Sequence, residues 1–519
     1  MTRRLLWIAL TALLVAALTA LIFLIRAGDT GATGWPTTFD LSSSDNGVLF
    51  QFAQDVFTGR ALDWSFSPQV FVFPEIPISL VAYALAGGTV QAYYLIVAAM
   101  NNALLFVGLF ALIRYLFPGE SLARRLVRAG IATFPLLMLP LIGATWLFEY
   151  QLAPTYYFGM YLMIIVAPIL FFGCARWVKI ALGIGIALTA ASNPLALVFT
   201  VPALACVLLL RGFSGGFRTV LRPAAWSGGT ILLAFVIRIA FFTRLQGGSP
   251  LAYIDDAVFS GRIANIETYI RSLLAAPATA SIVLIGAVLA VGGLAVAIVL
   301  AVRLLRKRET FGPRTTATLY YSLVPVTGLA ATLVLIITDY LYLWPVLIAP
   351  LVFVLLPLPT RWVPWALPVL SAALVATAFV SGAVPDLAAA SAYFSYRSPE
   401  TRCLDEKLPP DVTIGYSTFS DARRIELTSR RPFRLIQLKS SGVRAYWLTN
   451  RDYARDNVGR FFYINAQGDE PPINVSYLEH EFGKPDSSFT CGPGQTVLIY
   501  SQSSKLAAIK ARYSTLPAP

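Results

Sequence analysis

The chain has 519 residues, of which 57% are hydrophobic and 13% carry a charge, with a mean hydropathy of +0.68. Soluble domains carry about 25% charged residues, so most of this chain is expected to lie in lipid. The formal net charge is +13, and most of the excess of Lys and Arg falls before residue 385, between hydrophobic runs. That placement is typical of the basic cytoplasmic loops of a membrane protein and argues against nucleic-acid binding.

The hydrophobic runs predict a mostly α fold, a polytopic bundle of transmembrane helices. Arg3 and Arg4 precede the first run, 5–25, which is long enough to cross a bilayer and too long for the core of a typical cleaved signal peptide, the rival reading. The run 76–88 is too short to place, so it is either re-entrant or compensated by another crossing. We expect eleven spans, with thirteen as the alternative, and the ten later candidates are 91–116, 129–148, 157–173, 177–192, 194–210, 225–243, 278–302, 317–338, 341–358 and 363–384.

Basic residues predict the orientation of the bundle. Arg and Lys residues gather in five connections, at 114–128, 176–179, 211–222, 303–308 and 361. We therefore place these connections and the N-terminus in the cytoplasm. The chain is expected to be an integral protein of the plasma membrane. The polar segments then left outside the cell are 26–74, 149–156, 244–277 and 385–519.

Residues 385–519 differ in composition from the membrane part, 1–384, and predict an extracytoplasmic α/β domain. Cys403 and Cys491 are its two cysteines, and an outward-facing pair of this kind predicts a disulfide. Cys174 and Cys206 lie in apolar runs and are expected to be core residues. The predicted strands and helices are 412–416, 433–438, 445–448, 461–464 and 496–500, and 421–429 and 474–482.

The outer loop 26–74 contains an amphipathic segment that follows the sequence Asp45-Asn-Gly. Its apolar residues recur at helical spacing and its polar residues take the opposite face. We therefore expect a short helix lying flat at the membrane surface, with Asp45 at its N-terminus. The apolar face consists of Leu49, Phe52, Ala53, Val56 and Phe57, and the polar face of Gln51, Gln54, Asp55 and Thr58.

The outer loop 244–277 begins with Gly247-Gly-Ser-Pro250, a flexible hinge signature. It continues through Asp255 and Asp256 into a second amphipathic segment with Arg262 and Arg271. Such a loop is able to close over a substrate, and a solvated connector with a surface helix is an equally good interpretation.

The sequence contains no nucleotide-phosphate loop, no zinc-type spacing and no Ser/His/Asp arrangement. Its one histidine, His480, lies between Glu479 and Glu481 in the outer domain and is expected on a helix surface. Carboxylates are therefore the expected groups for any proton transfer.

The order of features in the first loop resembles the GT-C superfamily of polytopic glycosyltransferases, which includes protein O-mannosyltransferases and aminoarabinose transferases. The matching residues cover about the first 120 positions, together with the plan of many spans and an outer C-terminal domain. They are the pattern Asp45-x4-Phe50-x2-Ala53, a helix end at Gly59, and the aromatic and proline residues Trp64, Phe66, Pro68, Phe71, Phe73, Pro74 and Pro77.

The resemblance implies transfer of a sugar from a polyprenyl-phosphate donor to a glycan, lipid or protein acceptor on the outer face. In that superfamily an acidic residue of the first outer loop is the base or a metal-binding carboxylate. Asp45 matches this position best, with Asp40 as the second candidate. The family often has a second acid beside the first, whereas this chain has Asn46, so a divalent ion such as Mg²⁺ or Mn²⁺ is only a possible cofactor.

Other residues could bind the substrate. Arg238 lies near the outer end of a span, where an ionisable residue is a functional candidate, although its side chain could also snorkel to the headgroups. Arg262 and Arg271 are weaker candidates for holding phosphate. Residues of another outer segment could line the sugar site or form an ordinary aromatic belt: Glu149, Tyr150, Tyr156 and Tyr157.

Two alternatives remain open from the sequence. Asp45 follows three serines and precedes a helical run, so it could simply cap the helix. The chain could also be a transporter or flippase of lipid-linked sugars with an outer partner-binding domain. Transporters tend to carry midplane charges and internal repeats, and few charges and no clear repeat are found here, which favours the enzyme.

Overall fold

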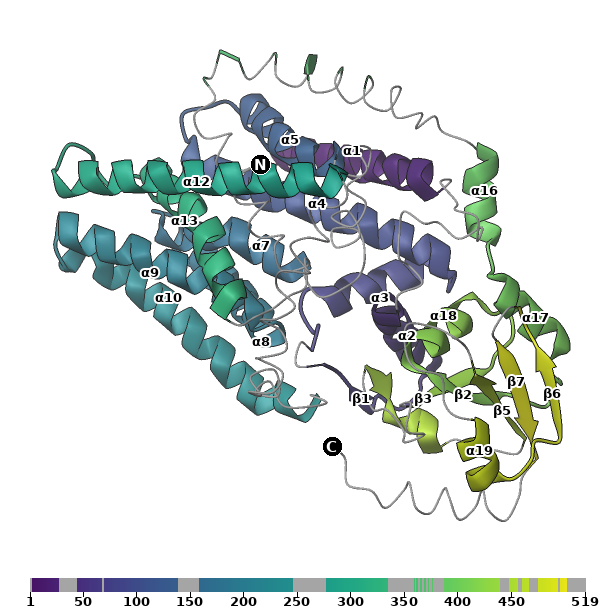
Figure 1. Ribbon diagram of the computed structural model, residues 1–519. Coiled ribbons are helices and arrows are strands. Elements are labelled where there is room, and N and C mark those ends of the chain that lie inside the picture. The colour runs from purple at the N-terminus through teal and green to yellow at the C-terminus, as the bar shows by residue number, and fades with distance from the viewer. Residues whose placement is uncertain are drawn as a thin grey trace.

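The computed structural model consists of a helical bundle and a smaller α/β domain that lie side by side (Figure 1). The structure describes residues 2–27, 44–67, 70–138, 158–245, 277–334, 387–438, 448–455, 460–465, 475–492 and 495–501, with single positions between 359 and 376. The mostly α fold with a C-terminal α/β domain is the one predicted.

The bundle is built from long apolar helices. Within the described residues, four helices are long and apolar enough to cross a membrane: Arg3–Ile25, Val90–Leu116, Leu195–Gly215 and Arg218–Leu245. They belong to α1 (Thr2–Ala27), α4 (Val90–Leu116), α9 (Leu195–Gly215) and α10 (Arg218–Ile237) with the turns that continue it. The other bundle helices are α5 (Leu122–Met138), α7 (Phe158–Val166), α8 (Arg176–Ser192), α12 (Pro277–Leu305) and α13 (Pro313–Val334).

These helices correspond to nine predicted spans, and two of them begin seven residues earlier than predicted, α5 at Leu122 and α10 at Arg218. The helix predicted at 129–148 begins at Leu122 instead, since Arg124, Arg125 and Arg128 are tolerated in its first turns. Arg128 is buried there because it pairs with Glu120 at 2.7 Å. The predicted spans 341–358 and 363–384 lie outside the continuously described residues, so the total of eleven to thirteen spans stays a prediction.

Basic connections gather at the end of the bundle away from the α/β domain. Figure 1 shows the α9–α10 and α12–α13 connections at that end. Arg314 of α13 donates to the carbonyl of Leu116 at 3.1 Å, and both Arg314 and Arg128 stack on the ring of Phe117. This grouping agrees with the predicted topology, and the assignment of this end to the cytoplasm stays a prediction.

The short apolar run at 76–88 forms α3 (Glu75–Ala86), which does not cross the bundle. Twelve helical residues span about 18 Å, against about 30 Å for the hydrocarbon core. The segment before α3 is held at the ends of other helices, because Phe66 N donates to Leu245 O and Phe73 N to Ser192 Oγ. A turn at Gly87 then leads into α4. Helix α3 is therefore too short to cross the bilayer, and the re-entrant alternative stays a prediction.

The predicted surface helix is α2 (Ser44–Thr58), but its polar face is not solvated. Gln51 and Asp55 are fully buried, whereas Phe57 on the expected apolar face is 54% exposed. This difference results from tertiary packing, because α2 packs between α3 and α18 (Phe419–Thr428) of the C-terminal domain. Gln51 and Asp55 of the polar face therefore contact that domain and are not exposed to water.

The C-terminal domain contains a five-stranded mixed sheet in the order β3-β2-β5-β7-β6. Strands β2 and β3 are parallel, β2 and β5 are parallel, and β7 is antiparallel to both β5 and β6. Their bounds are β2 (Ile414–Thr418), β3 (Arg434–Leu438), β5 (Phe461–Asn465), β6 (Ser487–Thr490) and β7 (Thr496–Tyr500), with α16 (Leu387–Ser395), α17 (Pro399–Lys407), α18 and α19 (Val475–Phe482) around them.

Four predicted strands lie within two residues of β2, β3, β5 and β7, and both predicted helices within two residues of α18 and α19. Of the fifth, 445–448, only Leu448 lies within the described residues, so that strand stays a prediction. After Leu448 the chain forms β4 (Thr449–Asn450), which leaves the main sheet and pairs with β1 (Trp64–Ser65) of the first outer loop. Strand β6 was not predicted, and its residues are mostly exposed.

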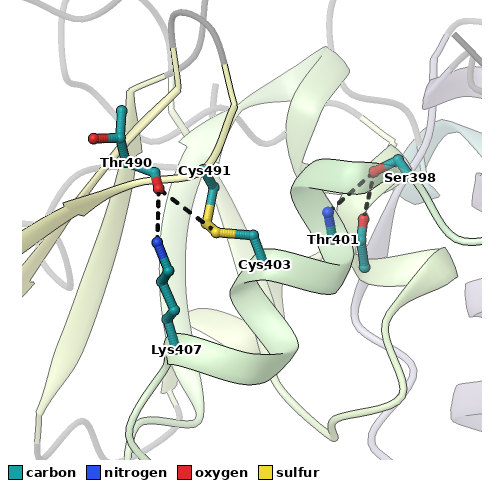
Figure 2. Close-up of a disulfide and its surroundings, with 6 residues drawn as sticks. All are labelled: Ser398, Thr401, Cys403, Lys407, Thr490 and Cys491. Carbon is teal, nitrogen blue, oxygen red and sulfur yellow. Dashed lines mark hydrogen bonds between the residues drawn. A yellow bond between two sulfur atoms is a disulfide. The ribbon is translucent and has the colours of Figure 1, made fainter.

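The predicted disulfide between Cys403 and Cys491 is confirmed, with a Cα–Cα distance of 5.5 Å (Figure 2). It joins α17 to the residue that follows β6. Helix α17 begins after Ser398, whose hydroxyl accepts from Thr401 N at 3.1 Å, and Pro399 takes the first helical position. Cys174 and Cys206 are free and half-buried in the bundle.

Removing the disulfide should destabilise the C-terminal domain. The two cysteines are 88 residues apart, and closing a loop of that length stabilises a fold by about 4 kcal/mol in the chain-entropy model. We expect Cys403→Ala with Cys491→Ala to lower the unfolding temperature of the purified chain, measured by tryptophan fluorescence. Cys206→Ala is the control, and an equal shift in both would contradict a stabilising role.

Candidate functional site

The candidate site is centred on α2, which lies where the bundle meets the C-terminal domain. Asp45 is the second residue of this helix, in agreement with its predicted place at the N-terminus. Gly47, two residues further, allows close approach to α18, because a Cβ there would overlap the side chain of Leu427. Val48 and Leu49 are almost completely buried. The first turns of α2 are therefore held tightly against both parts of the protein.

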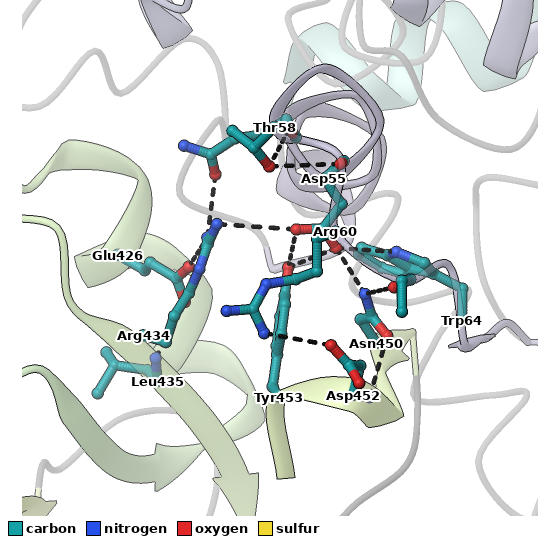
Figure 3. A network of polar contacts seen from close by, with 12 residues as sticks. Asp55, Thr58, Arg60, Trp64, Glu426, Arg434, Leu435, Asn450, Asp452 and Tyr453 are labelled. Carbon is teal, nitrogen blue, oxygen red and sulfur yellow. Dashed lines mark hydrogen bonds and ion pairs between the residues drawn. The ribbon is translucent and has the colours of Figure 1, made fainter. Parts of the chain in front are cut away.

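The carboxylate of Asp55, near the other end of α2, is the centre of a buried polar network (Figure 3). Trp64 Nε1 donates to Oδ2 at 3.0 Å and Asn450 Nδ2 donates to the same oxygen at 2.8 Å. The Tyr453 hydroxyl lies 2.9 Å from Oδ1 and 2.8 Å from Oδ2. Arg434 Nη2 completes the set at 3.7 Å from Oδ1.

The small β1–β4 sheet places two of these donors side by side. In its antiparallel register Trp64 lies opposite Asn450, so both side chains reach Asp55. The pairing is extended by a hydrogen bond from Arg451 N to Asp63 O at 2.8 Å. A second Nδ2 proton of Asn450 goes to Ala61 O at 2.7 Å. Two strand residues from each of two distant segments thus form one hydrogen-bonded junction.

Arg434 connects this junction to the main sheet, since it is the first residue of β3. Its Nη1 donates to Gln54 Oε1 at 3.0 Å and pairs closely with Glu426 Oε1. The other oxygen of Glu426 accepts from Leu435 N at 3.1 Å. The guanidinium also lies over the ring of Tyr453, 5.1 Å from its centroid.

Charges in the network compensate one another. Burial raises the pKa of Asp55 above its ordinary value, against hydrogen bonds from Asn450 and Tyr453 and the charge of Arg434. Burial alone would lower the pKa of Arg434, but Glu426, Tyr453 and Asp55 more than offset it, and the pKa is raised. Because every oxygen of Asp55 already accepts hydrogen bonds, this carboxylate is a clamp between two parts of the chain and is not placed to deprotonate a substrate.

Arg238 is the predicted substrate-binding residue that the structure describes. It begins a π-helical turn, Arg238–Phe242, that continues α10, and such turns are frequent at functional sites. Its Nη1 donates to the carbonyl of Ala191, close to the end of α8, at 2.8 Å. The guanidinium is therefore held at the ends of two neighbouring helices, beside the segment 70–73 that also bonds to Ser192.

Glu75 is a buried carboxylate that the sequence analysis did not single out. It is 5% exposed, and its Oε1 accepts from Gly159 N of α7 at 2.9 Å. Only glycine fits at 159, because a Cβ would overlap Pro74 and Glu75 itself. The available signal was an acid within the proline-rich entry to a hydrophobic run, where a charge requires a partner.

The remaining predicted site residues lie outside the described residues. They are Asp40 in the first outer loop, Glu149, Tyr150, Tyr156 and Tyr157 in the next, and Asp255, Asp256, Arg262 and Arg271 in the loop 244–277. Of the predicted catalytic and substrate-binding set, the structure thus places the side chain of Arg238 and the helix that carries Asp45.

A divalent cation such as Mg²⁺ binds mainly through oxygen ligands, commonly one or two carboxylates plus substrate phosphates. Among the described side chains, no three His, Cys, Asp or Glu residues are grouped to hold a metal ion. The described residues therefore supply no preformed cage for Mg²⁺ or Mn²⁺, and metal dependence stays a prediction.

Comparison with known proteins gave no matching family model and no match among curated proteins. A solved structure of ArnT from Cupriavidus metallidurans bound to undecaprenyl phosphate aligns with 96% of this chain and 98% of its own length. The identity is 11% and the TM-score 0.42. The same ArnT in the apo state aligns with 95% and 97%, at 12% identity and a TM-score of 0.40.

Substituting Asp55 should loosen the junction. In Asp55→Asn the new amide group points N–H donors at the donors of Trp64, Asn450 or Tyr453, and Arg434 loses a counter-charge. Removing one partner of a buried charged network costs about 3 kcal/mol. We expect faster backbone hydrogen exchange in α2 and β4, measured by mass spectrometry.

The matched control is Asp452→Asn, which removes a half-exposed ion pair with Arg60 at 3.6 Å. A pair of this kind contributes roughly 0–1 kcal/mol. Equal exchange rates in the two variants would contradict the central role of Asp55.

The raised pKa of Asp55 also predicts a pH dependence. The pKa of the Asp55 carboxyl is higher in the folded state than its ordinary value of 3.8. The contribution of this group to stability is fully present below pH 3.8 and is lost as the pH rises through the folded-state pKa. The stability advantage of the wild type over Asp55→Asn should therefore shrink as the pH rises through the acid range. Thermal unfolding of both proteins at several pH values measures it, and an advantage that grows with pH would contradict the assignment.

Proposed function

We propose that the protein is a membrane glycosyltransferase of the GT-C type, which moves a sugar from a polyprenyl-phosphate donor to an acceptor hydroxyl on the outer face. The observation that carries the proposal is the way α2 is held. The acid-bearing first turn of this helix is packed between the bundle and the C-terminal domain, and its far end is fixed by Asp55. In this proposal the lipid-linked donor and the acceptor meet at this junction between the bundle and the C-terminal domain.

Asp45 is the proposed base. The acceptor oxygen attacks the anomeric carbon, the bond from that carbon to the phosphate oxygen breaks, and the polyprenyl phosphate leaves with the bonding electron pair. The proton of the acceptor hydroxyl passes to the Asp45 carboxylate. General-base assistance of this kind contributes roughly 10²–10⁴ in rate. Fixing α2 at both ends limits the motion of Asp45, which is what a positioned base requires.

Arg238 is proposed to hold the phosphate of the donor. Its guanidinium lies at the outer ends of α8 and α10, the level at which a lipid phosphate meets water. A positive charge there stabilises the negative charge that grows on the leaving phosphate. The apolar chain of the donor would lie along the exposed apolar surface of α10 and of the π-helical turn that continues it, which includes Leu232, Val236 and Ile239.

Asp45→Asn should abolish transfer and leave the fold intact. Asn has the same shape as Asp and is tolerated near a helix start, so the substitution removes the proton-accepting carboxylate of the second residue of α2 and keeps a polar side chain there. We expect the turnover of a synthetic polyprenyl-phosphate sugar to fall by about 10²-fold or more, with an unchanged unfolding temperature.

The assay is release of the sugar by purified protein in lipid nanodiscs, and Asp452→Asn serves as the control. Full activity of Asp45→Asn would remove Asp45 from the mechanism. Movement of the intact donor across vesicles by wild type, without cleavage, would instead identify a transporter of lipid-linked sugars.

A further inference from the structure

A small polar pocket lies beside the Asp55 network, between α2 and the C-terminal domain. Its volume is about 190 Å³, which corresponds to roughly six water molecules at liquid density. Three stretches form its walls: one face of α2, the turn between α3 and α4 at Gly88, and the segment from the end of α18 to β3. A single small ligand would therefore contact all three.

Gln51 of α2 forms part of this wall and has an unsatisfied amide. The residue is fully buried, yet neither Oε1 nor Nε2 has a hydrogen-bond partner among the described residues. An unpaired buried polar group is costly and rare in native structures. The terminal torsion of glutamine is broad, so the amide can turn toward the pocket within one side-chain rotamer. The amide is thus a donor and an acceptor that lack a partner at the edge of a cavity.

The charged groups of the pocket are already paired. Arg434 is engaged by Glu426 and Gln54, and the Glu426 carboxylate also accepts from Leu435 N. Arg431 donates to two backbone carbonyls, of Leu408 and of Pro409. An anion would have to compete with these bonds and with the carboxylate in the same wall, so the pocket favours a neutral ligand.

We propose that this pocket binds one neutral sugar ring. A hydroxyl group both donates and accepts, so adjacent hydroxyls of a sugar satisfy the two amide groups of Gln51 at once. Phe50 and Phe433 also line the pocket, each with only a small exposed part. The site follows from its own walls, and it stands whether or not the protein transfers a sugar.

The test measures binding without any donor, using the full chain in lipid nanodiscs. Saturation-transfer NMR with a panel of neutral methyl glycosides should show contact with at least one of them. For that glycoside, Gln51→Leu should weaken binding at least tenfold. Gln91→Leu is the matched control, because Gln91 lies outside the pocket and donates to Tyr396 O.

Stability provides a second readout that separates a binding role from a structural one. Because Gln51 has no partner, Gln51→Leu should keep or raise the unfolding temperature of the ligand-free protein while it loses the sugar. A lower unfolding temperature would mean that Gln51 supports the fold, and would overturn the proposal.

Three binding results would also overturn it. They are the absence of contact with every glycoside, equal binding by Gln51→Leu, and displacement of the glycoside by inorganic phosphate. The first would leave water as the occupant and the last would assign the pocket to an anion. Sugar binding without transfer activity would instead uphold this site and count against the proposed function.

Discussion

One buried carboxylate determines how the two parts of this protein are joined. Asp55 lies on a helix of the first outer loop, and three of its four partners, Asn450, Tyr453 and Arg434, come from the C-terminal domain. A carboxylate without partners in such a place would be strongly unfavourable, so the position of α2 and the position of the domain depend on each other. The aromatic rings around it exclude water, which strengthens each hydrogen bond. Segments nearly 400 residues apart in the chain thereby form one rigid unit.

The fold could largely be predicted, because lipid and sheet formation both leave strong patterns in the sequence. Long apolar runs have few alternatives to membrane helices, and alternating segments near 414, 434, 461 and 496 were found as strands. The disulfide could also be predicted, because Cys403 and Cys491 are the two cysteines of the polar domain. Helix α2 was also predicted, within one residue of its start at Ser44.

The partner of its polar face could not be predicted. Gln51, Gln54 and Asp55 have the spacing of an ordinary solvated face, and a single sequence contains no sign that a domain 380 residues later covers it. Strands β1 and β4 have two residues each, which is too short for the alternation of apolar and polar residues that predicts a strand. Glu75 was missed for a related reason, since its partner is the backbone N–H of Gly159, and a backbone group leaves no trace in residue identity.

Helix α2 carries three features along its length, and their spacing follows from helix geometry. At a rise of about 1.5 Å per residue, Gln51 lies about 9 Å and Asp55 about 15 Å from Asp45 along the axis. Gln51 and Asp55 are one turn apart on the same face, against the C-terminal domain, whereas Asp45 is about 120° away from Gln51 around the axis. A sugar in the pocket at Gln51 would thus lie next to the clamp, and the proposed base is about 9 Å away along the helix axis. Any change in the docking of the C-terminal domain would move the pocket walls and the first turn of α2 together. This coupling makes the domain part of the site, although neither Asp45 nor Arg238 belongs to it.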